Sequence, residues 1–255
     1  IRRPPRSTLD RSSAASDVYK RQIISIVFLG ACAAPTSSND LLNEKNKNGY
    51  LFYFNEEIYL HEKELKSKLL LPAEGYTVPD YLNLLPNAKR EYRSGHHLGV
   101  DFSAPLNYPI RAVFDGVVVR SNQFQKDVDI DTYNTFLEMS AKVGKTPDDI
   151  YHFILLGKSV VIDHGFSITD KFRTITVYSH LSSISDDLVA GTKVKQGDII
   201  GFSGNTGTSS GALQNSKGAH LHWEIFFDDS NGRYFLGQNI PLDLLKDNID
   251  SLFDQ

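Results

Sequence analysis

Short runs of β-branched and aromatic residues, separated by turn-forming residues, recur along most of the sequence after Pro86. Such runs are typical of β-strands joined by tight turns. They do not alternate with helical patterns, as the strands of a parallel sheet would. We therefore predict a mainly β fold, an antiparallel β-sandwich, with strands in residues 99–102, 109–113, 116–120, 158–165, 173–181, 198–203 and 220–227.

One segment interrupts this pattern and predicts a small helical insertion at residues 121–157. Apolar residues between positions 133 and 143 fall at helical spacing. A second helix is expected to start with Thr146 as its N-cap and Pro147 at its first position, followed by two acidic residues. We expect this second helix to end at Gly157.

The chain before the β-rich domain, which we place at residues 86–250, divides into four segments. Residues 1–22 lack hydrophobic periodicity and resemble translated sequencing-adapter sequence, so we treat them as non-native and exclude them from the fold. Residues 23–32 are apolar, too short to cross a bilayer core of ~30 Å, and suit the end of a signal peptide. Residues 33–49 form a polar tether. Residues 50–85 form an N-terminal extension that begins with a hairpin and packs on the core.

The only cysteine, Cys32, ends the apolar run. The sequence Leu29-Gly30-Ala31-Cys32 resembles the bacterial lipobox, in which the cysteine is lipidated and becomes the new N-terminus; a plain secretory signal is the alternative. We therefore expect an exported protein, anchored in the cell envelope by lipid on Cys32. A single cysteine excludes an intramolecular disulfide, so any metal site must use histidines and carboxylates.

The charge balance argues against nucleic acid as a partner. The chain has 27 Lys and Arg against 31 Asp and Glu, and residues 1–22 contain six of the basic and two of the acidic residues. The remainder therefore has 21 basic and 29 acidic residues, a net charge of −8. Nucleic-acid binding depends on clustered Lys and Arg, which such an acidic body does not provide.

The first candidate site is the motif that contains His97 and Asp101. On a straight strand two residues four apart would be separated by ~13 Å, too far to share an ion. Gly99 between them permits a bend or bulge that could bring both side chains to one point. The neighbouring His96 leaves open an alternative register, in which His96 and not His97 would face the site.

Two further segments contribute histidines. His220 and His222 lie two apart in a predicted strand, so they project from the same face, about 7 Å apart. His180 ends another predicted strand. Taken singly, each of these histidines could equally be a structural or surface residue.

Together the motifs resemble the lysostaphin/LytM-type (β-lytic) zinc metalloendopeptidases. That family shows H-x-G-x-D, then Tyr-x-His-Leu, then a glycine-rich segment, then His-Leu-His followed by an aromatic residue and Glu. The matching segments here, in the same order, are residues 97–101, 178–181, 194–207 and 220–224. The resemblance extends over about residues 86–227.

The resemblance implies a LytM-like core of the duplicated-hybrid-motif type and one Zn²⁺ ion per chain. It makes His97, Asp101 and His222 the zinc ligands, and His180 and His220 the catalytic pair. A neutral imidazole can accept a proton from water and later supply one to the leaving amine. Which of the two histidines does which stays open.

The segment before the first ligand motif offers two more candidates. Tyr92 or Arg93 could face the tetrahedral oxyanion that forms when water attacks the peptide carbonyl. A surface role is the alternative for both. The insertion at 121–157 is much longer than the connection at this place in the minimal domain of the family, so the identity of the substrate stays open.

The resemblance further implies an endopeptidase, here expected to be a monomer, that cuts peptide cross-links in peptidoglycan, its partners being stem peptides or cross-bridges. The main alternative is a non-catalytic LytM-like lipoprotein that binds and activates a cell-wall amidase. Such proteins usually lack several ligands, whereas all five His and Asp positions are present here.

A biotinyl-like carrier is set aside, because no lysine stands at the expected hairpin apex.

Overall fold

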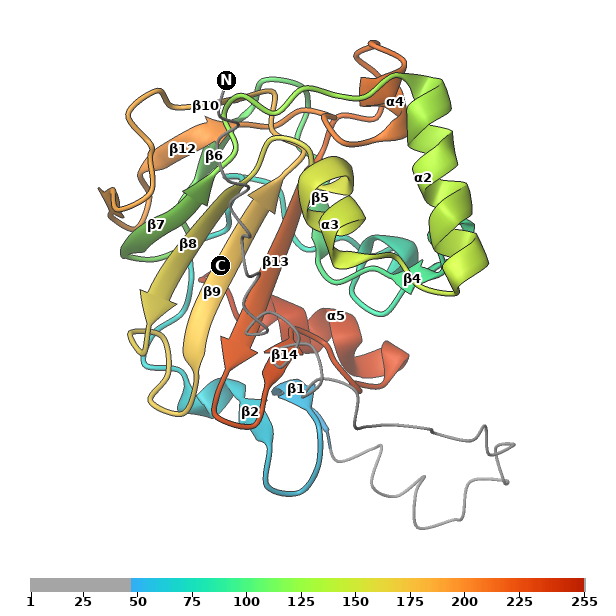
Figure 1. Cartoon of the computed structure of the whole chain (residues 1–255). Helices are drawn as coiled ribbons and strands as arrows, with labels where there is room; N and C mark the ends of the chain where they lie inside the picture. The colour runs from blue at the N-terminus through green and yellow to red at the C-terminus, as the bar shows by residue number, and fades with distance from the viewer. Residues whose placement is uncertain (1–46, 255) are drawn as a thin grey trace, which may run out of the picture. The chain divides into compact units, whose positions relative to one another are not determined.

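A large seven-stranded antiparallel sheet is the main element of the computed structural model, which describes residues 47–254 (Figure 1). Its strand order is β11-β7-β8-β9-β13-β14, and β5 also pairs with β13. The bounds are β5 Val100–Phe102, β7 Gly116–Ser121, β8 Val160–Gly165, β9 Arg173–Ser179, β11 Lys193–Val194, β13 Leu221–Asp228 and β14 Arg233–Phe235.

A smaller sheet, in the order β10-β12-β6, provides the second layer. Its strands are β6 Pro109–Arg111, β10 Ser183–Ile184 and β12 Ile199–Phe202. One hydrophobic cluster draws buried side chains from both sheets, including Val118, Ile162, Trp223, Ile110, Ile184 and Ile200. The prediction of a mainly β, antiparallel fold is therefore confirmed, and each predicted strand is present.

Residues before the β-rich domain contribute to the same core. They form the predicted hairpin of β1 (Tyr50–Tyr53) and β2 (Tyr59–His61), followed by short 3₁₀ turns at Glu62–Glu64 and Leu82–Leu84. A third 3₁₀ turn, Glu91–Arg93, lies inside the domain. Phe52 of β1 stacks on Tyr234 and Phe227, so this hairpin is bound to the end of β13. The small β3 (Lys89–Arg90) and β4 (Gly95–His96) pair, and α5 (Leu242–Asp250) buries Leu245 and Ile249 in the core.

Strand β13 is buried on both faces, and this places the functional side chains. Alternate residues, among them Trp223 and Ile225, enter the core between the sheets. The other face carries His222, Glu224 and Phe226, and Phe226 packs against Leu156 at the end of the insertion. The polar residues of this face are thus covered by the insertion.

The helical insertion has two parts, as predicted. Helix α2 (Ile130–Val143) starts at Asp129, whose carboxylate accepts hydrogen bonds from two backbone amides of the first turn. The second part begins as the short α3 (Asp148–Ile150) and continues as a π-helical turn at Tyr151–Leu155. Figure 1 shows α2 and α3 to the right of strands β9 and β13 of the large sheet. The short α4 (Ser209–Ala212) packs against α2 through Ala212.

The predicted capping of the second helix is wrong. Pro147, not Thr146, occupies the N-cap position, and it makes no side-chain cap. The Thr146 hydroxyl instead donates to the backbone carbonyl of Arg93 at 2.7 Å. The predicted end at Gly157 is confirmed, since Gly157 adopts φ +58° and lies directly against the backbone of Thr206.

Predictions for residues 1–46 lie outside the described part of the chain, including the signal peptide and the lipidation of Cys32. Within residues 47–254, no helix has the length and apolar character that a membrane span needs.

Candidate metal centre

Three side-chain atoms converge at one point on the buried face of β13. The Nε2 of His97 lies 2.9 Å from Asp101 Oδ1 and 2.9 Å from His222 Nδ1, and Asp101 Oδ1 lies 2.8 Å from His222 Nδ1. All three residues are buried, with at most 8% of their surface exposed. Among the described residues, this is the one group of His, Cys, Asp and Glu side chains arranged to hold a metal ion.

Strand pairing brings the three residues together. In the ladder between β5 and β13, Asp101 pairs directly with His222. Gly99 precedes β5, and a Cβ there would lie only 2.3 Å from the carbonyl oxygen of Trp223. Glycine is therefore required because β13 approaches so closely. Its backbone lies outside the left-handed region, and His97 reaches Asp101 from the segment just before the strand.

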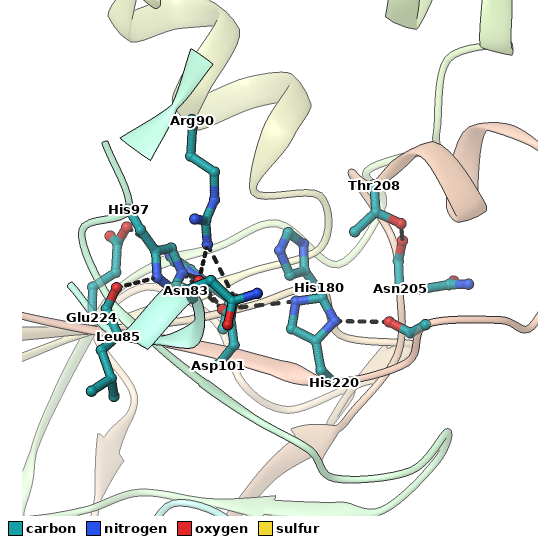
Figure 2. Close-up of polar contacts among 12 residues, drawn as sticks. Asn83, Leu85, Arg90, His97, Asp101, His180, Asn205, Thr208, His220 and Glu224 are labelled. Atoms are coloured by element: carbon teal, nitrogen blue, oxygen red, sulfur yellow. Dashed lines mark hydrogen bonds and ion pairs between the residues drawn. The ribbon is translucent and has the colours of Figure 1, made fainter. Parts of the chain in front are cut away.

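The outer nitrogens of both imidazoles are held by acceptors. His97 Nδ1 donates to the carbonyl of Leu85 at 2.9 Å (Figure 2). His222 Nε2 donates to Glu224 Oε1 at 2.9 Å. Each ring therefore directs its other nitrogen at Asp101, as metal-binding histidines do when a carbonyl or carboxylate fixes the tautomer. This donor set of two imidazoles and one carboxylate fits a divalent cation such as Zn²⁺.

The electrostatics of the cluster favour a cation. Burial would raise the pKa of Asp101, but His97 and His222 hold it well below its usual range. Burial lowers the pKa of His97. Burial also opposes a charge on His222, but its hydrogen bonds to Asp101 and Glu224 outweigh this and raise the pKa of His222 to about 9. A proton on His222 thus occupies the place that a bound cation would take, so metal binding releases it.

Two further histidines lie beside the cluster. The rings of His180 and His220 are 4.8 Å apart, and His220 Nε2 lies 3.8 Å from Asp101 Oδ1 (Figure 2). His180 Nδ1 contacts the carbonyl of Thr206 at 2.8 Å, and His220 Nδ1 contacts that of Gly218 at 2.8 Å. With Nδ1–H donating in both rings, each Nε2 is left as a proton acceptor.

His180 has an unusual backbone and an unusual pKa. Its φ of +60° lies in the left-handed region, which a non-glycine residue adopts at an energetic cost that is typical of functional sites. Burial, with the neighbouring His220 and His222, holds the pKa of His180 well below its usual value. His180 is therefore a neutral imidazole at neutral pH.

A cavity of about 490 Å³ opens over this cluster. One side of its wall comes from the insertion, which contributes Tyr133, Asn134, Leu137, Tyr151 and Leu155. Arg90 also lines the cavity, and its Nη2 lies 3.7 Å from Asp101 Oδ2 and donates to the carbonyl of Asn83 (Figure 2). The site therefore carries positive charge beside the carboxylate.

The structure distinguishes the candidates that flank the first motif. His96 is exposed on β4, paired with Lys89, and it is His97 that joins the cluster. Tyr92 lines the cavity and is 57% exposed. Arg93 is buried and donates to Thr146 and to the carbonyl of His96, so it holds the insertion in place.

Sequence reasoning assigned no role to three residues near the cluster: Arg90, Tyr151 and Glu224. The signal for Glu224 was present, since it stands two residues after His222 on the same strand face. Nothing in the sequence signals Arg90 or Tyr151, because their places depend on contacts between distant segments.

Comparisons with known proteins agree with this geometry. A match to Peptidase family M23 covers residues 95–234. An uncharacterized metalloprotease of Buchnera aphidicola is 31% identical over 134 residues, which are 52% of this chain and 24% of that protein. The peptidoglycan DD-endopeptidase ShyA of Vibrio cholerae is 30% identical over 133 residues, which are 52% of this chain and 21% of that protein. The chain thus spans about a quarter or less of these relatives' length.

Among solved structures, lysostaphin from Staphylococcus simulans is similar over 70% of this chain and 56% of that chain. The sequence identity is 20% and the TM-score is 0.37.

Proposed function

The chain belongs to peptidase family M23, and from this premise we propose that it is a zinc-dependent endopeptidase that hydrolyses peptide cross-links of bacterial peptidoglycan. The observation that carries the proposal is the convergence of His97 Nε2, Asp101 Oδ1 and His222 Nδ1 within 2.9 Å of one another. Two imidazole nitrogens and one carboxylate oxygen leave room for a further, open coordination position, as in catalytic zinc sites.

His97, Asp101 and His222 would hold the ion. When bound, Zn²⁺ supplies Lewis acidity that polarises a peptide carbonyl and lowers the pKa of bound water. Asp101 and Glu224 together bring two negative charges to the buried cluster, which matches the charge of a divalent cation. Burial would raise the pKa of Glu224, but the hydrogen bonds from His222 and Tyr151 and the charges of the nearby imidazoles together lower it.

His180 and His220 would move the protons. The Nε2 of His180 is free to accept a proton from the attacking water, because its Nδ1 is bound to the Thr206 carbonyl. The Nε2 of His220 is turned toward the same cluster. A protonated imidazole in this position would then supply a proton to the leaving amine or stabilise the oxyanion.

The cavity supports a peptide substrate. Its wall combines phenol rings and aliphatic side chains from the insertion with the guanidinium of Arg90, groups that suit an extended chain bearing carboxylates. The printed name of the Vibrio cholerae relative, a peptidoglycan DD-endopeptidase, makes peptidoglycan the substrate to test first.

We extend the proposal to the organisation of the chain. The peptidase domain would occupy residues 86–250, preceded by the extension 50–85 and the tether 33–49. Lipid on Cys32 would hold the enzyme, as a monomer, at the cell envelope near its substrate. The support for this anchoring is the lipobox-like sequence alone.

The test is incubation of the purified protein with defined cross-linked muropeptides, with and without a zinc chelator, followed by mass spectrometry. We expect cleavage of the cross-link, loss of cleavage with the chelator, and recovery on addition of Zn²⁺. A chain that binds zinc but cleaves no muropeptide, and instead stimulates a cell-wall amidase, would replace the proposal with the activator alternative.

A further inference from the structure

We propose that Tyr151 of the helical insertion is a positioning residue for the metal centre, acting through Glu224 on the imidazole of His222. The inference rests on the proposed function, because it takes His222 to be a ligand of Zn²⁺. It adds that the insertion is part of what makes the ion bind, beyond its contribution to the wall of the cavity.

The contacts form one chain of hydrogen bonds. The hydroxyl of Tyr151 donates to Glu224 Oε1, and the same oxygen accepts from His222 Nε2 at 2.9 Å. The opposite nitrogen of His222 faces His97 and Asp101. The orientation of the His222 ring is therefore set on one side by the cluster and on the other by Glu224.

Glu224 needs Tyr151 because it has few other partners. Its side chain is fully buried, and its Oε2 has no hydrogen-bond partner among the described residues. A buried carboxylate normally has its oxygens satisfied by several donors. Here a single oxygen receives both hydrogen bonds, so among residues 47–254 Tyr151 is the one donor besides His222 that fixes the direction of this carboxylate.

Tyr151 is itself held firmly. It opens the π-helical turn at Tyr151–Leu155, a rare conformation that is frequent at functional sites. The guanidinium of Arg93 lies over its ring, 5.2 Å from the centroid. Arg93 Nη1 also donates to the Thr146 hydroxyl at 2.9 Å, and that hydroxyl donates back to the Arg93 carbonyl. The insertion is thus tied to the segment that leads into His97.

The expected consequence is a change in metal affinity. Residues that hold metal-binding imidazoles in place typically account for about 10-fold to 100-fold in affinity. Tyr151→Phe removes the hydroxyl while keeping the ring, so the contact with Arg93 and the packing stay. We expect this variant to bind Zn²⁺ at least about 10-fold more weakly than the wild type.

The test measures Zn²⁺ affinity of the full chain by competition with a chromophoric chelator, and checks the fold of each variant by thermal unfolding. Tyr133→Phe is the matched control, since this phenol also lies in the insertion and lines the cavity but makes no contact with Glu224. Its zinc affinity should equal that of the wild type. In a Glu224→Ala background, Tyr151→Phe should have no further effect on zinc affinity, because the path between them is already broken.

Three outcomes overturn the inference. Equal zinc affinity of the wild type and Tyr151→Phe would refute the role of Tyr151 and leave the proposed function standing. The same loss in the Glu224→Ala background as in the wild type would show that the hydroxyl does not act through Glu224. A wild-type chain without measurable zinc affinity would overturn this inference and the proposed function together.

Discussion

His220 and His222 are two residues apart and both face Asp101, yet they lie at different distances from its carboxylate. Nδ1 of His222 lies 2.8 Å from Asp101 Oδ1, whereas Nε2 of His220 is 3.8 Å from the same oxygen. Only the closer of the two belongs to the group of three converging donors. This difference agrees with the proposal that His222 is a ligand of the ion and His220 a neighbouring proton carrier.

Gly99→Ala should weaken both folding and zinc binding. The added Cβ would lie 2.3 Å from the Trp223 carbonyl oxygen, so β5 must move away from β13 and carry Asp101 away from His222. We expect a loss of about 1–3 kcal/mol in the free energy of unfolding, measured by urea denaturation, together with weaker zinc binding. Gly144→Ala is the control, since it strains only the end of α2 at φ +78° and should keep full zinc affinity.

Substitutions in the cavity wall formed by α2 should change substrate binding but not zinc binding. Asn134 and Leu137 line the cavity without contacting the three converging donors. Leu137→Ala and Asn134→Ala should therefore raise KM or change cross-link preference, while zinc affinity stays at the wild-type value. Steady-state kinetics on two or more muropeptides measures this. Unchanged kinetics in both variants would show that this part of the insertion does not contact substrate. Deleting residues 124–156 would be a poorer test, because it also removes Tyr151.

Stability should depend on pH through His164, a buried histidine away from the metal centre. His164 is bound to the Asp115 carbonyl and the Thr176 hydroxyl, and burial lowers its pKa below the ordinary value of 6.5. The unfolded chain therefore binds a proton more readily than the folded one, and His164 favours the folded state less as pH falls below about 6.5. The free energy of unfolding should drop between pH 7.5 and pH 5.5, and His164→Gln should reduce that drop. An equal drop in the variant would assign the effect to other groups.

The proposed lipid anchoring at Cys32 can be tested separately. Several acyl chains hold a protein stably on a membrane, whereas one binds marginally. Expressed with its signal in a bacterial host, the protein should incorporate labelled palmitate, and Cys32→Ser should abolish incorporation. Wild-type protein that is unlabelled and found in the soluble fraction would contradict the lipoprotein assignment.

Much of the fold could be predicted because strands carry a local signal. The alternation of apolar residues along 220–227 predicts β13 and places His220 and His222 on one face without any knowledge of the partner strand. Local patterns could not predict the cluster of His97, Asp101 and His222, because it depends on pairing between β5 and β13, which are more than a hundred residues apart in the sequence. The family resemblance supplied that information.

The contacts of the insertion could not be predicted in the same way. Thr146 has the residue type and position of a helix N-cap, but a hydrogen bond to Arg93, 53 positions away, determines its role. The contact between Tyr151 and Glu224 spans 73 positions and arises in a π-helical turn that has no sequence signature. Tertiary contacts outweigh local preference at both places.

The most direct test of the account is the zinc content of three purified variants, measured by plasma emission beside a peptidoglycan-clearing assay. His222→Ala should contain little zinc and show no activity, because two remaining ligands cannot hold the ion. His220→Ala and His180→Ala should contain near-stoichiometric zinc, with turnover reduced by roughly 10²–10⁴. If His220→Ala lost its zinc while His222→Ala kept it, the assignment of His222 as ligand and His220 as proton carrier would be contradicted.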